Sequence, residues 1–295
     1  MKHTLKRWVI ATRPWSFPAS VMPVLTTIFW LWSHGTSVNW LFGLLAVVNI
    51  VLVHAAGNVW SDISDYKQGV DAQDTFGVRL LVDGEFTATE FRRLSVSLNV
   101  LAVLMGLCMV WITGPLLLLI GAIGILFSLC YPFLKYHALG DVVIIFCYSL
   151  LPMLGTSLIV SGQIHWDVLW LAVPVGLITV AILHVNNVRD IVTDKRAGIQ
   201  TFPMLTGRNF GISLYAFEVL FPYIWLLGLA FFSIASWWIL VALLSLPIAL
   251  GNVRAIMIYK KQNNDMCARL DEKTAQLQLL FSLLMIIGMS LSVYF

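Results

Sequence analysis

Charged residues are scarce in this chain of 295 residues, where Asp, Glu, Lys and Arg together make up 11% of the sequence. A soluble domain usually carries about 25% charged residues. Hydrophobic residues make up 59% of the chain, and the mean hydropathy is +0.87. The composition excludes an ordinary soluble domain. It predicts an all-α polytopic membrane protein, because helices satisfy their own backbone groups in lipid.

Cysteine is also scarce, and the four cysteines form no CxxC pair. They are Cys108, Cys130, Cys147 and Cys267. This scatter argues against a disulfide framework and against a zinc site. The net charge of +3 is too small to indicate a nucleic-acid partner. The lipid bilayer is the partner that the composition predicts.

Nine apolar segments approach the roughly 20 residues that a membrane helix needs. Together they predict one transmembrane domain over 1–295, a bundle of nine helices. The segments are 17–32, 40–58, 94–113, 115–133, 140–160, 167–187, 210–232, 236–258 and 275–294. The first segment is short and begins among prolines.

The basic residues are distributed unequally between the two sides of this predicted bundle. All 18 Lys and Arg lie in the N-terminal segment or in connections on the same side. The opposite connections at 33–39, 113–114 and 161–166 contain none. By the positive-inside rule, the N-terminus is cytoplasmic and the C-terminus lies outside. The predicted location is the cell (inner or plasma) membrane.

Two groups of oxygen-bearing side chains lie at ends of apolar segments on the predicted cytoplasmic side. Carboxylates at membrane depth are costly and usually functional. Positions i, i+4 and i+7 share one helix face, so Asn58, Asp62 and Asp65 form one stripe of oxygens and Asn187, Asp190 and Asp194 form another. The first group contains Asn58, Ser61, Asp62, Asp65 and Asp71, and the second contains Asn187, Asp190 and Asp194.

These groups suit a hard divalent cation, because Mg2+ prefers oxygen ligands and bridges carboxylates to substrate phosphates. Nearby cations suit a diphosphate. They are Arg79, Lys135, Arg189, Lys195 and Arg196. The residues therefore predict a metal-diphosphate site at the cytoplasmic face of an apolar bundle. For one cluster alone, solvated loop charges would be the better interpretation, but two clusters favour function.

A weak internal repeat relates the two clusters. A shift of 129 residues superposes Asn58 on Asn187 and Asp65 on Asp194. This match predicts two halves, the first four helices and the next four, followed by a ninth helix. Membrane folds commonly place sites at such a repeat interface. Chance is an equally good explanation of so few matches.

The first cluster resembles a motif of the UbiA superfamily of intramembrane prenyltransferases, Asn-Asp-x-x-Asp followed by a further Asp. The segment from Ser61 through Asp62 and Asp65 to Gly69 and Asp71 matches it. Ser61 stands where the family has Asn. Asn58, one turn earlier, is the alternative donor for that role.

The second cluster resembles the Asn-Asn-x-Arg-Asp-x-x-x-Asp motif of 1,4-dihydroxy-2-naphthoate prenyltransferases, a branch of that superfamily. Here it begins at Asn186 and runs to Asp194. Ile199 replaces a family Lys, and Lys195 or Arg196 would cover the missing contact. Smaller matches include Tyr131 with Lys135, Gly140-Asp141, and Arg13-Pro14.

The resemblance implies a function for the predicted site. Mg2+ held by Asp62, Asp65, Asp190 and Asp194 would bind the diphosphate of a polyprenyl donor. The prenyl group would pass to 1,4-dihydroxy-2-naphthoate with loss of CO2 and diphosphate, giving a demethylmenaquinol. Substrate contacts would come from Asn58, Ser61, Asp71, Arg79, Tyr131, Lys135, Asp141, Asn187, Arg189, Lys195 and Arg196.

Two alternatives remain open. The acceptor could be 4-hydroxybenzoate, homogentisate or heme within the same family. A secondary transporter would instead place ionisable residues near the bilayer midplane, where Glu218 is the one candidate in the sequence. Structural roles are the better interpretation for Glu218, His54 and His184, while Asp141 could contact substrate or favour a helix N-terminus.

Overall fold

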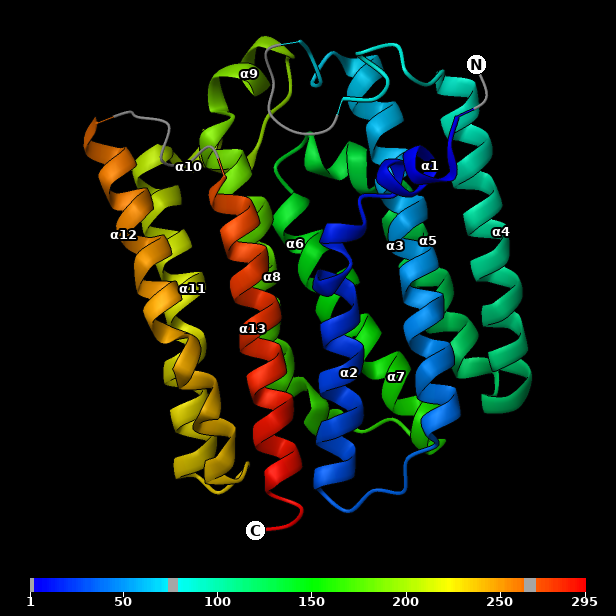
Figure 1. Ribbon diagram of the computed structural model, residues 1–295, viewed down its shortest axis with the longest axis vertical. Coiled ribbons are helices and arrows are strands. Elements are labelled where there is room, and N and C mark those ends of the chain that lie inside the picture. Colours follow the sequence, from blue (N-terminus) through cyan, green and yellow to red (C-terminus); the bar gives the residue numbers. More distant parts are fainter. Residues whose placement is uncertain (1–2, 74–78, 263–268) are drawn as a thin grey trace.

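The chain folds into long helices that lie side by side (Figure 1). This computed structural model describes residues 3–73, 79–262 and 269–295. In that part of the chain, eight helical segments are long and apolar enough to cross a membrane. The prediction of an all-α membrane protein is confirmed. Cys267 lies outside the described residues, while Cys108, Cys130 and Cys147 are free thiols.

The spans coincide with most of the predicted apolar segments. Five are single α-helices, and three join helical pieces. The single helices are α3 (Trp40–Gln68), α4 (Ala88–Thr113), α5 (Pro115–Lys135), α11 (Arg208–Phe231) and α13 (Leu270–Leu291). The composite spans are α6 (Gly140–Ile145) with α7 (Leu151–Ser161), a 3-10 turn Trp166–Val168 with α8 (Leu169–Arg189), and a 3-10 segment Trp237–Ser245 with α12 (Leu246–Gln262).

The first predicted span differs from the rest. It forms α2 (Pro18–Ser33), which has 16 residues. At 1.5 Å per residue such a helix is roughly 24 Å long, shorter than a hydrocarbon core of about 30 Å. Eight helices, rather than the nine predicted, therefore reach membrane-spanning length in the described ranges.

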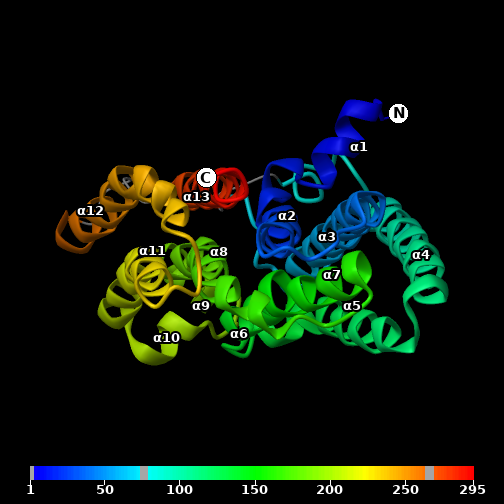
Figure 2. The same cartoon turned by 90° about the horizontal axis from the view of Figure 1, so that it is seen from below.

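Seen along the bundle, the helices form two rows (Figure 2). One row contains α12, α13, α2, α3 and α4, and the other contains α11, α8, α6, α7 and α5. In α8, 67% of the most apolar window is buried, against 11% in both α4 and α5. The central helix α8 is therefore packed by protein on most sides, while α4 and α5 present apolar surface to the surroundings.

Helix α3 is longer than the sequence predicted. Asn39 caps its start by accepting a hydrogen bond from the Phe42 N–H at 3.1 Å. The helix continues past residue 58 and ends at Gly69, whose φ of 72° is the left-handed conformation that glycine adopts without strain. Asp62 and Asp65 are therefore helical residues, as their spacing predicted.

Short helices gather where α3 and α8 end. They are α1 (Leu5–Ala11), α9 (Ile191–Arg196) and α10 (Phe202–Thr206). We call this end of the bundle the aspartate end, because it carries Asp62, Asp65, Asp190 and Asp194. The N-terminus lies at this end and the C-terminus at the opposite one (Figure 1).

Candidate active site

A cavity of about 1230 Å³ joins the two aspartate clusters. Its wall includes Asp65 at the aspartate end and Ala46 much further down α3. By helical rise these two residues are separated by roughly 28 Å. The deep part is lined by apolar side chains such as Val24, Leu117 and Ile159. The cavity thus has a polar head and a long apolar body.

Most of the predicted site residues line the polar head. The first cluster contributes Asn58, Ser61, Asp65 and Asp71, the second contributes Asn187, Arg189, Asp190 and Asp194, and α5 contributes Tyr131 and Lys135. Residues that are far apart in the sequence therefore meet around one space, as the paired motifs predicted.

Asp65 is the most heavily contacted carboxylate of the first cluster. Its side chain lies 3.2 Å from the Lys135 Nζ and accepts a hydrogen bond from the Tyr136 hydroxyl at 2.7 Å. The Ser61 hydroxyl donates to Asp65 at 3.4 Å. The Asn58 amide nitrogen is already used, since it donates to the Thr12 carbonyl and to the Ser16 hydroxyl.

Asp62 does not share the orientation of Asp65. It is buried, forms an ion pair with Arg13, and is not part of the cavity wall. Arg13 itself lines the cavity. Arg13 has a φ of 53°, an unusual value for a residue with a side chain. The turn into the 3-10 helix η1 (Pro14–Ser16) directs this arginine towards the site.

The second cluster contains a break in the helix. Helix α8 ends at Arg189, Asp190 is the junction residue, and α9 begins at Ile191. The Arg189 guanidinium holds the Asp190 carboxylate through two hydrogen bonds, of 2.8 and 2.7 Å. It also lies 3.4 Å from Asp271 on α13. Despite the break, Asn187, Asp190 and Asp194 all line the cavity.

Burial and crowding of like charges affect the carboxylates outside the spans. Burial raises the pKa of Asp194 to about 7, with Lys135 acting in the opposite direction. Burial, reinforced by the negative charge of Asp65, also raises the pKa of Asp71. An uncompensated cluster of carboxylates disfavours their charged forms, and a bound cation would reverse that effect.

Besides Asp62, four predicted residues are not part of the cavity wall. Arg79 hydrogen-bonds the Gln73 carbonyl and lies 3.9 Å from Asp83. Lys195 and Arg196 are exposed on α9, next to Asp194 in sequence. Asp141 contacts His184 and Asn187 instead. The structure thus places Lys135 and Arg189 on the cavity wall, and Arg79, Lys195 and Arg196 off it.

The structure also brings in residues that sequence reasoning did not assign to the site. Tyr136 follows Lys135 and hydrogen-bonds Asp65, and Asp271 lies beside Arg189 in the first turn of α13. In the sequence, Arg13-Pro14 is only a minor match to the family. Sequence spacing does not predict that a residue in an N-terminal turn contacts a helix that begins at residue 40. The dipeptide itself was therefore the one sequence signal for Arg13.

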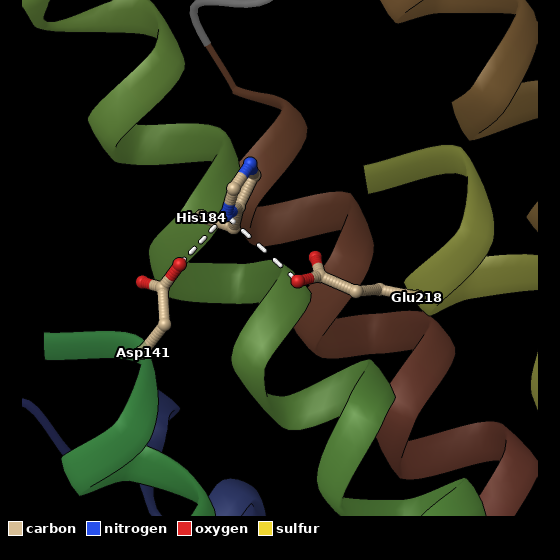
Figure 3. A group of neighbouring side chains, drawn as sticks. All are labelled: Asp141, His184 and Glu218. Atoms are coloured by element: carbon tan, nitrogen blue, oxygen red, sulfur yellow. Dashed lines mark hydrogen bonds and ion pairs between the residues drawn. The ribbon is translucent and has the colours of Figure 1, made fainter. Parts of the chain in front are cut away.

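A second polar cluster lies beside the cavity, where α6, α8 and α11 meet (Figure 3). Asp141, His184 and Glu218 place one ligand atom each within 4.8 Å of one another, a spacing that could hold a metal ion. His184 and Glu218 are buried. Glu218 thus has a structural contact to His184, at 3.8 Å, as expected of a buried acid.

The cavity wall itself offers a different set of donors. Carboxylate oxygens come from Asp65, Asp71, Asp190, Asp194, Asp271 and Glu272, and the wall also includes His54 and, in the π-helical turn Phe146–Leu150, Cys147. His54 is occupied by hydrogen bonds with Ser20 and Ser16. A set of carboxylate oxygens of this kind suits Mg2+.

Comparison with known proteins identifies the class of enzyme. Residues 20–289 match the model of the UbiA prenyltransferase family. The chain belongs to the UbiA prenyltransferase family. It is therefore a transferase, and family membership speaks against the transporter alternative.

Relatives within the family cover nearly the whole chain. UbiA prenyltransferase domain-containing protein 1 of Xenopus tropicalis is 32% identical over 99% of this chain and 84% of its own length. The Drosophila melanogaster homolog is 33% identical over 96% of this chain and 79% of its own length. The 1,4-dihydroxy-2-naphthoate octaprenyltransferase of Bacillus subtilis (strain 168) is 26% identical over 96% of this chain and 92% of its own.

Solved structures share the fold. A UbiA homolog from Archaeoglobus fulgidus bound to GPP and Mg2+ has a TM-score of 0.63 and 12% identity. The match covers 95% of this chain and 99% of that homolog. A digeranylgeranylglyceryl phosphate synthase has a TM-score of 0.64 and 21% identity, with 99% of each chain covered. At these identities the likeness establishes the UbiA-like fold.

Proposed function

We propose that this enzyme transfers a polyprenyl group from a polyprenyl diphosphate to 1,4-dihydroxy-2-naphthoate, with loss of CO2 and diphosphate. The product would be a demethylmenaquinol, an intermediate on the way to menaquinone. One observation carries the proposal: a single cavity joins both aspartate clusters to a long apolar interior. A diphosphate with an apolar tail matches both halves of that cavity.

Asp65, Asp190 and Asp194 would hold Mg2+ on the cavity wall, and Asp62 would complete the set by exchanging its pairing with Arg13. When bound, Mg2+ supplies charge stabilisation for the departing diphosphate.

Lys135 and Arg189 lie on the same wall and are the cations best placed to contact the diphosphate. Arg13 also lines this wall and is positively charged, so we add it to the predicted diphosphate ligands. Asn58, Ser61, Asp71, Tyr131 and Asn187 would contact the substrates.

The allylic C–O bond of the donor breaks, and its electron pair leaves with the diphosphate. The ring carbon that bears the acceptor's carboxylate forms the new C–C bond to the allylic carbon. The bond to the acceptor's carboxylate then breaks, its electron pair returns to the ring, and CO2 departs. The apolar wall, with Val143 and Ile144 of α6 and Leu151 beyond the π-helical turn Phe146–Leu150, would keep water from the allylic cation.

The choice of acceptor rests on the second motif and on the Bacillus subtilis relative, whose name specifies 1,4-dihydroxy-2-naphthoate. The alternatives are other aromatic acceptors within the family, 4-hydroxybenzoate, homogentisate or heme. The Asn186-Asn187-x-Arg189-Asp190 pattern favours the naphthoate over these.

We further propose that α2 also crosses the membrane, giving nine spans. The preceding turn, Pro14–Ser16, lengthens α2 at the aspartate end. With nine spans, the N-terminus and the aspartate end face the cytoplasm and the C-terminus faces outside, in agreement with the distribution of basic residues. The two-half repeat remains a prediction.

The proposal is tested with membranes that contain this protein, a labelled polyprenyl diphosphate and 1,4-dihydroxy-2-naphthoate. We expect an apolar prenylated naphthoquinol and CO2 with Mg2+, and neither with EDTA. Product with 4-hydroxybenzoate but not with the naphthoate would refute the acceptor and retain prenyl transfer. Membranes without this protein are the control for endogenous activity.

A further inference from the structure

The polar cluster beside the cavity forms a continuous chain of contacts. The His184 Nε2 lies 3.0 Å from the Gly211 carbonyl oxygen, and the His184 Nδ1 lies 2.8 Å from the Asp141 Oδ2. The other oxygen of Asp141 accepts a hydrogen bond from the Asn187 amide at 3.4 Å. The chain thus runs from α11 through α8 and α6 to a residue of the second motif.

The partners of the two ring nitrogens constrain where hydrogens lie on His184. A backbone carbonyl can only accept, so the His184 Nε2 must carry a hydrogen. The Nδ1 faces a carboxylate, so a hydrogen there makes His184 an imidazolium between two acceptors. The carboxyl group of Glu218 lies 3.8 Å from the same ring nitrogen. His184 has no exposed surface, so a positive charge on its ring needs a carboxylate partner such as Asp141.

A proton explains this geometry better than a metal ion. Two ligands of a tetrahedral zinc ion with bonds of about 2.0–2.1 Å would be about 3.3 Å apart. The Nδ1–Oδ2 distance is 2.8 Å, the length of a charge-assisted hydrogen bond. Gly211 supports the contact, because its missing side chain lets α11 approach His184 closely.

Asn187 is the end of the chain that faces the cavity. Only the amide nitrogen of Asn187 can donate to the Asp141 carboxylate. With the nitrogen held there, the side-chain carbonyl oxygen has a single orientation left and remains the acceptor offered to the cavity. Without Asp141, the amide could rotate and present a donor instead.

We propose that His184 and Asp141 are positioning residues for Asn187, holding its amide so that its carbonyl oxygen faces the head group of the Mg2+–diphosphate substrate. This proposal rests on the proposed function, since it assumes a diphosphate in the cavity. His184 and Asp141 do not themselves touch the substrate in this scheme. They act through Asn187 and set the polarity of one contact.

The test is a double-mutant cycle on the binding of inorganic diphosphate in the presence of Mg2+, measured by calorimetry on the detergent-purified full chain. We expect His184→Gln and Asn187→Ala each to weaken binding about 10- to 100-fold, as for other residues that orient a ligand-binding group. In the double variant the losses should not multiply. Asp141→Asn should reproduce the effect of His184→Gln if that variant fails to fold.

Tyr223→Phe is the matched control. Tyr223 is buried on α11, and its hydroxyl pairs with Ser245 at 2.7 Å, outside the chain of contacts. This variant should bind diphosphate like the wild type. If the wild type binds diphosphate and the two losses multiply in the double variant, the positioning role is overturned and the proposed function stands. A wild type without Mg2+-dependent binding would overturn the proposed function instead.

Nitrogen NMR of histidine-labelled protein provides a second readout, with the His184 signal identified by its disappearance in His184→Gln. We expect both ring nitrogens of His184 to carry hydrogens. An Nδ1 without hydrogen, accompanied by a stoichiometric transition metal in the purified protein, would replace the hydrogen-bonded chain with a metal site. This readout does not depend on activity.

Discussion

The Tyr136 hydroxyl donates a hydrogen bond of 2.7 Å to Asp65, and the neighbouring Lys135 pairs with the same carboxylate at 3.2 Å. The end of α5 therefore holds the carboxylate that follows Asp62 by nearly one turn on α3. With a cation and a hydroxyl on one side, Asp65 has its remaining lone pairs available to the cavity. This arrangement makes Asp65 the residue whose loss should affect the site most directly.

Asp65→Asn should lower prenyl transfer by about 100-fold or more, because a lost metal ligand removes several kcal/mol of charge stabilisation. The measurement is the rate of product formation at saturating Mg2+. Asp83→Asn, in the loop paired with Arg79, is the matched control and should retain wild-type activity. A folded Asp65→Asn variant with normal turnover would disprove the metal assignment.

Ser61→Asn should be tolerated and should tighten Mg2+ binding, since it restores the oxygen donor typical of the family. Ser61 lines the cavity and is only half-buried, so there is room for a slightly longer side chain. The Mg2+ concentration for half-maximal activity should fall. If this concentration rises clearly, Ser61 does not occupy the position of the family Asn.

Arg189→Lys should weaken substrate binding about 10-fold or more, despite the unchanged charge. A lysine cannot reproduce the two hydrogen bonds to Asp190, and charged hydrogen bonds contribute about 1.5–3 kcal/mol. The KM for the prenyl diphosphate is the quantity to measure. Arg93→Lys, on the exposed side of α4, is the matched control. An unchanged KM would show that the fork geometry of Arg189 is unimportant.

Gly288→Ala should destabilise the bundle without touching the site. A Cβ at Gly288 would collide with the backbone carbonyl of Trp238, which no side-chain rotation can relieve. We expect a loss of about 1–3 kcal/mol, typical of overpacking, seen as a lower Tm in detergent. Gly228→Ala, which has no neighbour within 4 Å, is the comparison and should keep the wild-type Tm. Equal Tm values for both variants would contradict the close approach of α13 to this segment.

The sequence was sufficient to predict the helices and the meeting of the two motifs, because both depend on local patterns. Apolar runs specify spans, and the spacing of Asp62 and Asp65 specifies a helix. The orientation of Asp62 could not be predicted in this way. It is set by Arg13, whose approach depends on how an N-terminal turn packs against α3.

The second motif was predicted as one continuous helical stripe, and this was wrong. The helix breaks at Asp190, where the backbone bends between α8 and α9. Such a break depends on side-chain contacts, here the Arg189 fork and the Thr193 hydroxyl bonded to the Asp190 carbonyl at 2.9 Å. A similar reason explains why Arg79, Lys195 and Arg196 lie off the cavity wall. The orientation of loops and short helices depends on tertiary packing, which local sequence patterns do not specify.

The cavity's polar head and apolar body also have a consequence for diphosphate and the prenylated naphthoquinol, two products of the proposed reaction. Diphosphate is soluble only in water, and a prenylated naphthoquinol is soluble only in lipid. Once the C–O bond has broken, each product has its own solvent, and the two do not readily meet again. Separation between phases would then oppose the reverse reaction, and the enzyme would deliver its product directly to the membrane in which a quinone works.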